Sequence, residues 1–145
     1  MKKPDSLLVS AARKYIGVPF LHQGRNKHGL DCAGLAWISF RDAGFAATDY
    51  RAYGRTPHDG ELEKAMEVAL GAPVKVGNVS EADLQAGDVV LMRFTIEPHH
   101  VGIIGDYPYG GFSLIHTSGH SRKVIEHRLA ADHVKRITHI FRKPL

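Results

Sequence analysis

The sequence is poor in the features that cross-link a chain or anchor it in a membrane. It contains one cysteine, Cys32, which excludes an intrachain disulfide and a multi-cysteine metal cage. No apolar run approaches the roughly 20 residues that a membrane-spanning helix needs. The basic start is followed at once by Pro4 and Asp5, and Arg13 ends the short apolar run, so a secretory signal peptide is not expected.

The length and composition are those of an ordinary globular domain. The chain has 145 residues, of which 43% are hydrophobic and 23% charged. Domains typically have about 100–200 residues, and the sequence contains no repeat, low-complexity tract or linker. We therefore expect a single domain over residues 1–145.

The net charge of +4 is unevenly distributed along the chain. Residues 1–30 carry six Lys or Arg and one acid, residues 122–145 carry seven and two, and residues 31–121 carry six and twelve. Basic ends around an acidic middle could attract a polyanion such as nucleic acid or an acidic cell-wall polymer, but we expect a solvated surface whose charge is unevenly distributed. Because the basic ends do not alternate their charges with aromatic residues, a nucleic-acid partner is not expected.

The first half of the chain has helical periodicity. Apolar residues on one face predict helices over about 5–16, 31–43 and 57–70. Gly17 and Gly44 end the first two, and residues 17–30 between them are rich in glycine and other loop-forming residues.

The second half changes to short segments rich in Val, Ile and Phe that are separated by turn residues. This pattern is typical of an antiparallel sheet of about five strands. Helices first and strands second place the chain in the α+β class. The predicted strands are Asp88–Phe94, His100–Ile104, Phe112–His116, Lys123–His127 and Ile137–Phe141.

Cys32 lies where a nucleophilic thiol would be expected. It follows the glycine-bearing loop 17–30 and falls in the opening turn of the second predicted helix. Unpaired N–H groups and the helix dipole at that end stabilise a thiolate and lower its pKa, and they can also bind an oxyanion. The small residues Ala33 and Gly34 would let a substrate backbone approach closely. The alternative is a small buried cysteine that only fills space.

A thiol nucleophile needs a general base, and the chain contains ten histidines. That number alone identifies none of them. His99 and His100 are adjacent on a predicted strand, so they point to opposite faces and at most one can face a site. His116 ends the next predicted strand, 16 residues after His100, and neighbouring strands lie about 4.8 Å apart.

Five segments in order resemble the NlpC family of papain-like cell-wall cysteine peptidases. The resemblance implies an α+β, papain-like fold with N-terminal helices packed on the sheet. It also implies that Cys32 is the nucleophile, that His100 is the general base and that His116 orients His100. The segments are YIGVPF (15–20), GLDCAGL (29–35), AGDVVLMRF (86–94), HHVGIIG (99–105) and LIHTSG (114–119).

The chain departs from the family pattern beside the nucleophile. Ala33 stands where many members have Ser, and Phe20 where many have Tyr. In those members the segment around the cysteine and the tyrosine grip a free amino terminus of the substrate peptide. Asp31 is kept, so we expect it to contact the substrate. Gln23 could donate a hydrogen bond to the oxyanion or the substrate, or could be a solvated loop residue.

The resemblance predicts a cysteine endopeptidase that hydrolyses an amide bond in peptidoglycan stem peptides. PFLHQGR and VKRITHIFR are more similar to the branch found among phage-tail and gene-transfer-particle proteins than to secreted autolysins. We therefore expect a chain made in the cytoplasm without a signal peptide, incorporated in a phage-like particle with other tail proteins, and acting on the periplasmic cell wall. No cofactor, metal, nucleic acid or membrane partner is expected.

Three alternatives remain open at this point. An amidase would use the same thiol chemistry on the bond between sugar and peptide. A metal site could use His116 and His120, whose i, i+4 spacing would share a helix face, but the residues between them favour a turn. A tail-tip or adaptor protein could keep the fold without the activity.

Overall fold

The computed structural model describes residues 4–54, 60–94, 98–118 and 120–142. The helices are α1 (Pro4–Arg13), α2 (Cys32–Asp42), α3 (Glu61–Leu70) and α4 (Ala131–Arg136), with a 3-10 turn over Glu81–Asp83. The strands are β1 (Arg25–Asn26), β2 (Gly29–Leu30), β3 (Lys75–Val76), β4 (Val89–Arg93), β5 (Pro98–Asp106), β6 (Phe112–Ser118), β7 (Lys123–Arg128) and β8 (Ile137–Phe141). In this part of the chain no helix is long and apolar enough to cross a membrane.

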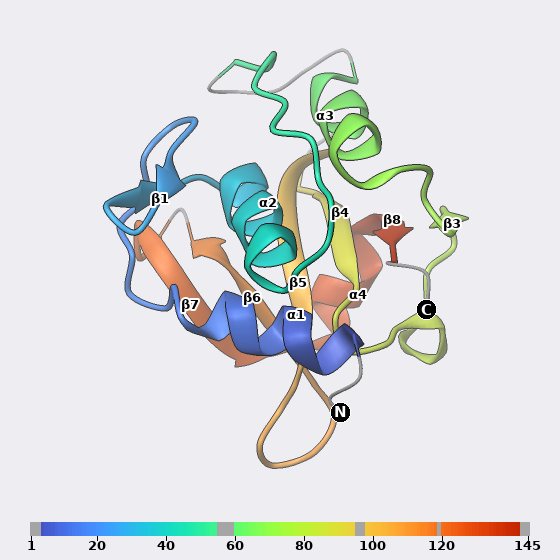
Figure 1. Ribbon diagram of the computed structural model, residues 1–145. Helices are drawn as coiled ribbons and strands as arrows, with labels where there is room; N and C mark the ends of the chain where they lie inside the picture. Colours follow the sequence, from blue (N-terminus) through green and yellow to red (C-terminus); the bar gives the residue numbers. More distant parts are fainter. Residues whose placement is uncertain (1–3, 55–59, 95–97, 119, 143–145) are drawn as a thin grey trace.

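A six-stranded antiparallel sheet forms the centre of the molecule. Its strand order is β3-β8-β4-β5-β6-β7, so the last strand inserts between β3 and β4. Helices α1 and α2 cover one face of the sheet, and α4 lies against the other (Figure 1). The predicted α+β class, with N-terminal helices on an antiparallel sheet, is confirmed.

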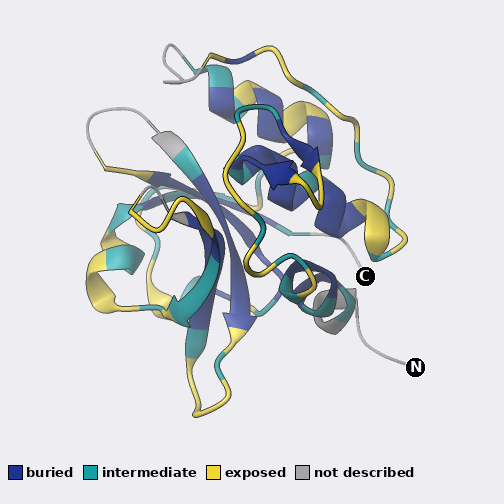
Figure 2. Ribbon diagram, turned by 90° about the vertical axis from the view of Figure 1, so that its left-hand side faces the viewer, coloured by how far each residue is buried: buried dark blue, intermediate teal, exposed yellow. Residues whose placement is uncertain are grey.

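The middle strands are buried on both faces. Along β4, Val89 and Leu91 pack in the core cluster beneath α1 and α2, whereas Val90 and Met92 pack in a second cluster with α4. Figure 2 shows this buried layer running through the strands and the helices that face them. A strand covered on both faces is apolar at consecutive positions, which explains the unbroken VVLM run in the sequence.

The five predicted strands are all present, with ends that differ by up to two residues. The sheet has a sixth strand because the two-residue β3 pairs with β8 at one edge. Such short pairings, like β1 with β2 and the six-residue α4, are too brief to produce a periodic pattern. The first helix ends at Arg13, before the expected end at about residue 16, and the start expected at residue 57 lies outside the described residues.

Gly34 lets α2 approach the loop that precedes it. A Cβ atom at this position would lie 2.2 Å from the Gly24 carbonyl oxygen and 2.8 Å from Arg25 Nη1. Gly34, two residues after Cys32, therefore makes room for the protein's own backbone. The sequence had suggested room for a substrate backbone, and for Gly34 that interpretation is wrong.

We expect Gly34→Ala to lower the free energy of unfolding by about 1–3 kcal/mol, because overpacking against backbone atoms forces the loop to move. In an unobstructed helix the same change is favourable by about 1 kcal/mol. Urea unfolding measures the difference. Gly54→Ala is the matched control, since among the described residues its Cβ would meet Glu61 Oε1 alone, at an ordinary contact distance of 3.9 Å. A Gly34→Ala protein as stable as the parent would contradict the close approach.

Candidate active site

Cys32 is the first residue of α2, as the sequence predicts. Asp31 is the N-cap, with extended backbone angles (φ −95°, ψ −178°), and its Oδ1 accepts a hydrogen bond from the Gly34 N–H at 2.7 Å. This N-terminal cap provides an acceptor for one of the unpaired N–H groups in the first turn of the helix. The backbone N–H groups of Val101, Ala33 and Cys32 itself favour the thiolate form of Cys32 and act to lower its pKa. The sulfur therefore lies beside the residue that follows His100 on β5.

The environment of the thiol disfavours its charged form. Burial of the sulfur raises the pKa of Cys32 to about 12, although the residue as a whole is only half-buried. The carboxylate of Asp31 contributes to this raised pKa, and the nearby backbone N–H groups act in the opposite direction. The pKa lowering expected from the helix start is wrong here, because desolvation and the adjacent anion outweigh the dipole.

His100 and His116 form a hydrogen-bonded pair on neighbouring strands. His100 Nε2 lies 2.7 Å from His116 Nδ1, and the two rings meet edge to face at 4.9 Å. The register of β5 with β6 places both side chains on one face of the sheet. The side chain of His99 lies outside the described residues, so the preference for His100 over His99 stays a prediction.

His116 is held neutral. The residue is only 8% exposed to solvent. Burial, together with the neighbouring His100, His127 and His133, lowers the pKa of His116 to about 3. A neutral imidazole at this position can accept a hydrogen bond from His100, which is the arrangement that orients a general base.

A third histidine, His127, adjoins this pair. Its Nε2 lies 2.8 Å from His116 Nε2, and the two rings meet at 4.9 Å. The sequence alone does not distinguish His127 from the other histidines of the basic C-terminal part. The only indication in the sequence is its place at the end of a predicted strand.

Asp31 is buried and receives four hydrogen bonds. Besides Gly34, its carboxylate accepts from the Gln23 N–H at 2.8 Å, from Arg25 Nη1 at 2.9 Å and from the Tyr53 hydroxyl at 2.6 Å. Asp31 is 3% exposed, and the side chain of Arg25 is 6% exposed. This network fixes the start of α2. The substrate contact expected for Asp31 stays a prediction.

Gln23 has its amide directed into the protein. Its Nε2 donates to the Arg51 carbonyl at 2.6 Å and to the Tyr53 carbonyl at 3.1 Å. Its backbone is in the left-handed region, with φ 59°, which is uncommon for a residue with a side chain. Gln23 therefore ties residues 51–53 to the loop before Cys32, and its expected hydrogen bond to a substrate stays a prediction.

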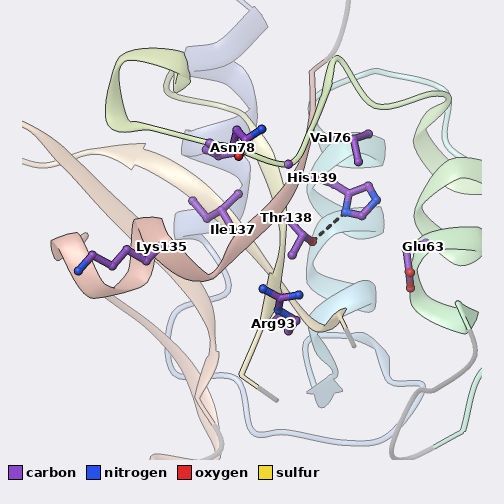
Figure 3. A pocket seen from close by; sticks show the side chains of 10 residues that line it. Glu63, Val76, Asn78, Arg93, Lys135, Ile137, Thr138 and His139 are labelled. Carbon is purple, nitrogen blue, oxygen red and sulfur yellow. Dashed lines mark hydrogen bonds between the residues drawn. The ribbon is translucent and has the colours of Figure 1, made fainter. Parts of the chain in front are cut away.

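A cavity of about 510 Å³ opens elsewhere, between α3, β8 and the end of β4 (Figure 3). None of the residues that line it is Cys32 or one of the three histidines described above. Within the described ranges no group of three or more His, Cys, Asp or Glu could hold a metal ion. The lining residues are Glu63, Val76, Gly77, Asn78, Val79, Arg93, Lys135, Ile137, Thr138 and His139.

We expect Asp31→Ala to lower the free energy of unfolding by about 3–5 kcal/mol. It breaks the buried pair with Arg25, which keeps its partly exposed partner Asp49 at 2.8 Å, and it removes the acceptor of the Tyr53 hydroxyl and of two backbone N–H groups. Asp132→Ala is the control: it breaks an exposed pair with Arg136 (3.3 Å), for which about 0–1 kcal/mol is expected. Urea unfolding of both variants measures the contrast. Equal effects would show that Asp31 does not support α2.

The lowered pKa of His116 makes stability depend on pH. The unfolded chain binds a proton at this residue near pH 6.5 and the folded chain only near pH 3. The contribution is therefore present above pH 6.5 and is lost as the pH falls toward 3. Between these limits we expect the parent to lose up to about 1.4 kcal/mol per pH unit more than His116→Gln. Parallel urea titrations measure this, and identical slopes for the two proteins would contradict a buried neutral His116.

The chain matches the sequence model of the NlpC/P60 family over residues 17–143. No curated protein shows a significant sequence match to it. Among solved structures it is similar to an NlpC/P60 family protein from Bacillus cereus, with a TM-score of 0.65 and 18% identity. That similarity covers 95% of this chain but only 39% of the Bacillus protein.

Two further structures match over nearly their whole length. The NlpC/P60 domain of the peptidoglycan hydrolase SagA has a TM-score of 0.60 and 19% identity, with 95% of this chain and 97% of the domain covered. RipD from Mycobacterium tuberculosis, a non-catalytic NlpC/P60 domain protein, has a TM-score of 0.59 and 13% identity, with 98% of each chain covered. At these identities the similarity shows the shared fold. The match to the family model is decisive: the chain belongs to the NlpC/P60 family.

Proposed function

We propose that the protein is a cysteine peptidase that hydrolyses an amide bond in peptidoglycan stem peptides. The observation that carries the proposal is the His100–His116 pair, hydrogen-bonded at 2.7 Å, together with the backbone N–H of Val101, the residue after His100, which favours the thiolate form of Cys32. A thiol, a base and a group that orients the base are the parts that covalent acyl transfer requires.

The chemistry begins with a neutral pair. Because the pKa of Cys32 is raised to about 12, the resting residue is a thiol. His100 accepts the thiol proton as the sulfur attacks the substrate carbonyl carbon, and backbone N–H groups at the start of α2 stabilise the oxyanion. His100 then returns the proton to the leaving amine as the C–N bond breaks. Water, activated by His100, hydrolyses the thioester and regenerates the thiol.

The relatives include both active and inactive members. SagA is a peptidoglycan hydrolase, whereas RipD is a non-catalytic domain adapted to bind peptidoglycan. Retention of Cys32, His100 and His116 in one sequence supports an enzyme, because packing alone does not require these three residue types together. A non-catalytic peptidoglycan-binding protein is the alternative.

The test is digestion of purified muropeptides, with products identified by mass spectrometry. We expect cleavage by the parent, no product with Cys32→Ala, and a loss of at least about a hundredfold with His100→Ala, the usual contribution of a general base. His99→Ala is the matched control and should keep most activity. The masses of the products separate a cut between two amino acids from a cut between sugar and peptide. Binding without cleavage by the parent would favour the non-catalytic alternative.

A phage-tail or gene-transfer particle is the setting we propose for this activity. The support is the similarity of PFLHQGR and VKRITHIFR to that branch of the family, together with the basic charge of residues 1–30 and 122–145. In that setting the chain is made in the cytoplasm, is carried with other tail proteins and acts on the periplasmic cell wall.

A further inference from the structure

The hydrogen bond between His100 and His116 continues beyond His116 to a third imidazole. We propose that His127 is a positioning residue that, through His116, fixes which nitrogen of His100 carries its proton. The proposal rests on the proposed function for its catalytic meaning. The observation that carries it is a row of three imidazoles joined at 2.7 Å and 2.8 Å, ending on a backbone carbonyl 2.9 Å from His127.

That carbonyl sets the direction of every hydrogen bond in the row. The oxygen of Arg128 can only accept, so His127 Nδ1 carries the proton and its Nε2 has the lone pair. His116 must then donate from Nε2 and accept at Nδ1. His100 in turn donates from Nε2, and its lone pair is on Nδ1. Nδ1 is therefore the nitrogen that takes the thiol proton.

The fold supports this row from both sides. The register of β6 with β7 pairs Leu114 with His127, which puts the His127 ring one step along the strand from His116, within reach of a diagonal contact. On the other side α4 brings the ring of His133 to 5.0 Å from His127. His133 Nδ1 accepts the Ala130 N–H, so His133 packs against the row but forms no described hydrogen bond with it.

Gly102 helps the strands approach at this point. A Cβ atom there would lie 2.5 Å from Leu114 Cδ1 and 3.6 Å from the Cβ of His116. Gly102 therefore has no side chain that could separate the rings of His100 and His116. Burial then keeps His116 neutral, since it is the main cause that lowers the pKa of this residue to about 3.

Loss of His127 would remove the reason for this order. His116 could then carry its proton on Nδ1 and donate to His100 Nε2. The proton of His100 would move to Nδ1, where it blocks acceptance of the thiol proton. The expected defect is therefore in turnover rather than in substrate binding.

The direct test is the tautomer of each histidine, measured by long-range ¹H–¹⁵N NMR of the imidazoles at pH 7.5. We expect protons on Nδ1 of His127 and on Nε2 of His116 and His100. In His127→Ala, His116 should show a mixture of both tautomers. A proton on His116 Nδ1 in the parent, or an unchanged His116 tautomer in His127→Ala, would overturn the proposal.

Kinetics give the second measurement. We expect kcat on a muropeptide to fall roughly three- to tenfold in His127→Ala with KM unchanged, the size expected for one neutral hydrogen bond. His127→Gln should restore kcat, because its carbonyl oxygen can accept from His116. His133→Ala is the matched control, since it removes an imidazole beside His127 without breaking the row. An equal loss in His133→Ala would show an effect of packing and overturn the proposal.

The two readouts separate this inference from the proposed function. If the parent has the predicted tautomers but cleaves no muropeptide, the proposed function fails and the tautomer assignment stands. If the parent cleaves muropeptides but His116 has the opposite tautomer, the inference fails and the proposed function stands.

Discussion

The buried carboxylate of Asp31 is the interaction on which the site depends. One side chain accepts hydrogen bonds from the start of α2, from the loop before it, from Arg25 and from Tyr53. Segments that are far apart in the sequence are thereby joined at the residue next to Cys32. Because a buried carboxylate is stable only when its charge is compensated, any movement of these partners carries a high cost, which keeps Cys32 in place.

The same carboxylate has an electrostatic consequence for the thiol. A helix start favours an anion, but Asp31 already occupies that position, and a second negative charge on the adjacent Cys32 is disfavoured by burial and by repulsion. In the proposed reaction the thiol proton therefore moves as the sulfur attacks, and no thiolate exists beforehand. The proposed reaction therefore depends on His100 as the proton acceptor and on the groups that orient it.

The two faces of the sheet pack against different parts of the protein. One packs against α1 and α2 and forms the larger core cluster, which holds the helix that carries Cys32. The other carries a smaller apolar cluster and packs against α4, whose His133 ring lies 5.0 Å from that of His127. Inner strands of a packed sheet are rigid, so the rings of His100 and His116 on β5 and β6 keep their spacing, and His127 stands beside them on the edge strand β7. Rigidity of this kind is what a fixed tautomer requires.

Local patterns in the sequence determined the α+β class, the helix start at Cys32 and the five longer strands, because periodicity and turn residues act over a few positions. The pairing of His100 with His116 followed from their strands and from the family resemblance. Tertiary structure alone decided the rest. The raised pKa of Cys32, the closure of Gly34 on Gly24 and the contact of His127 with His116 depend on burial and strand register, which bring together residues distant in the sequence.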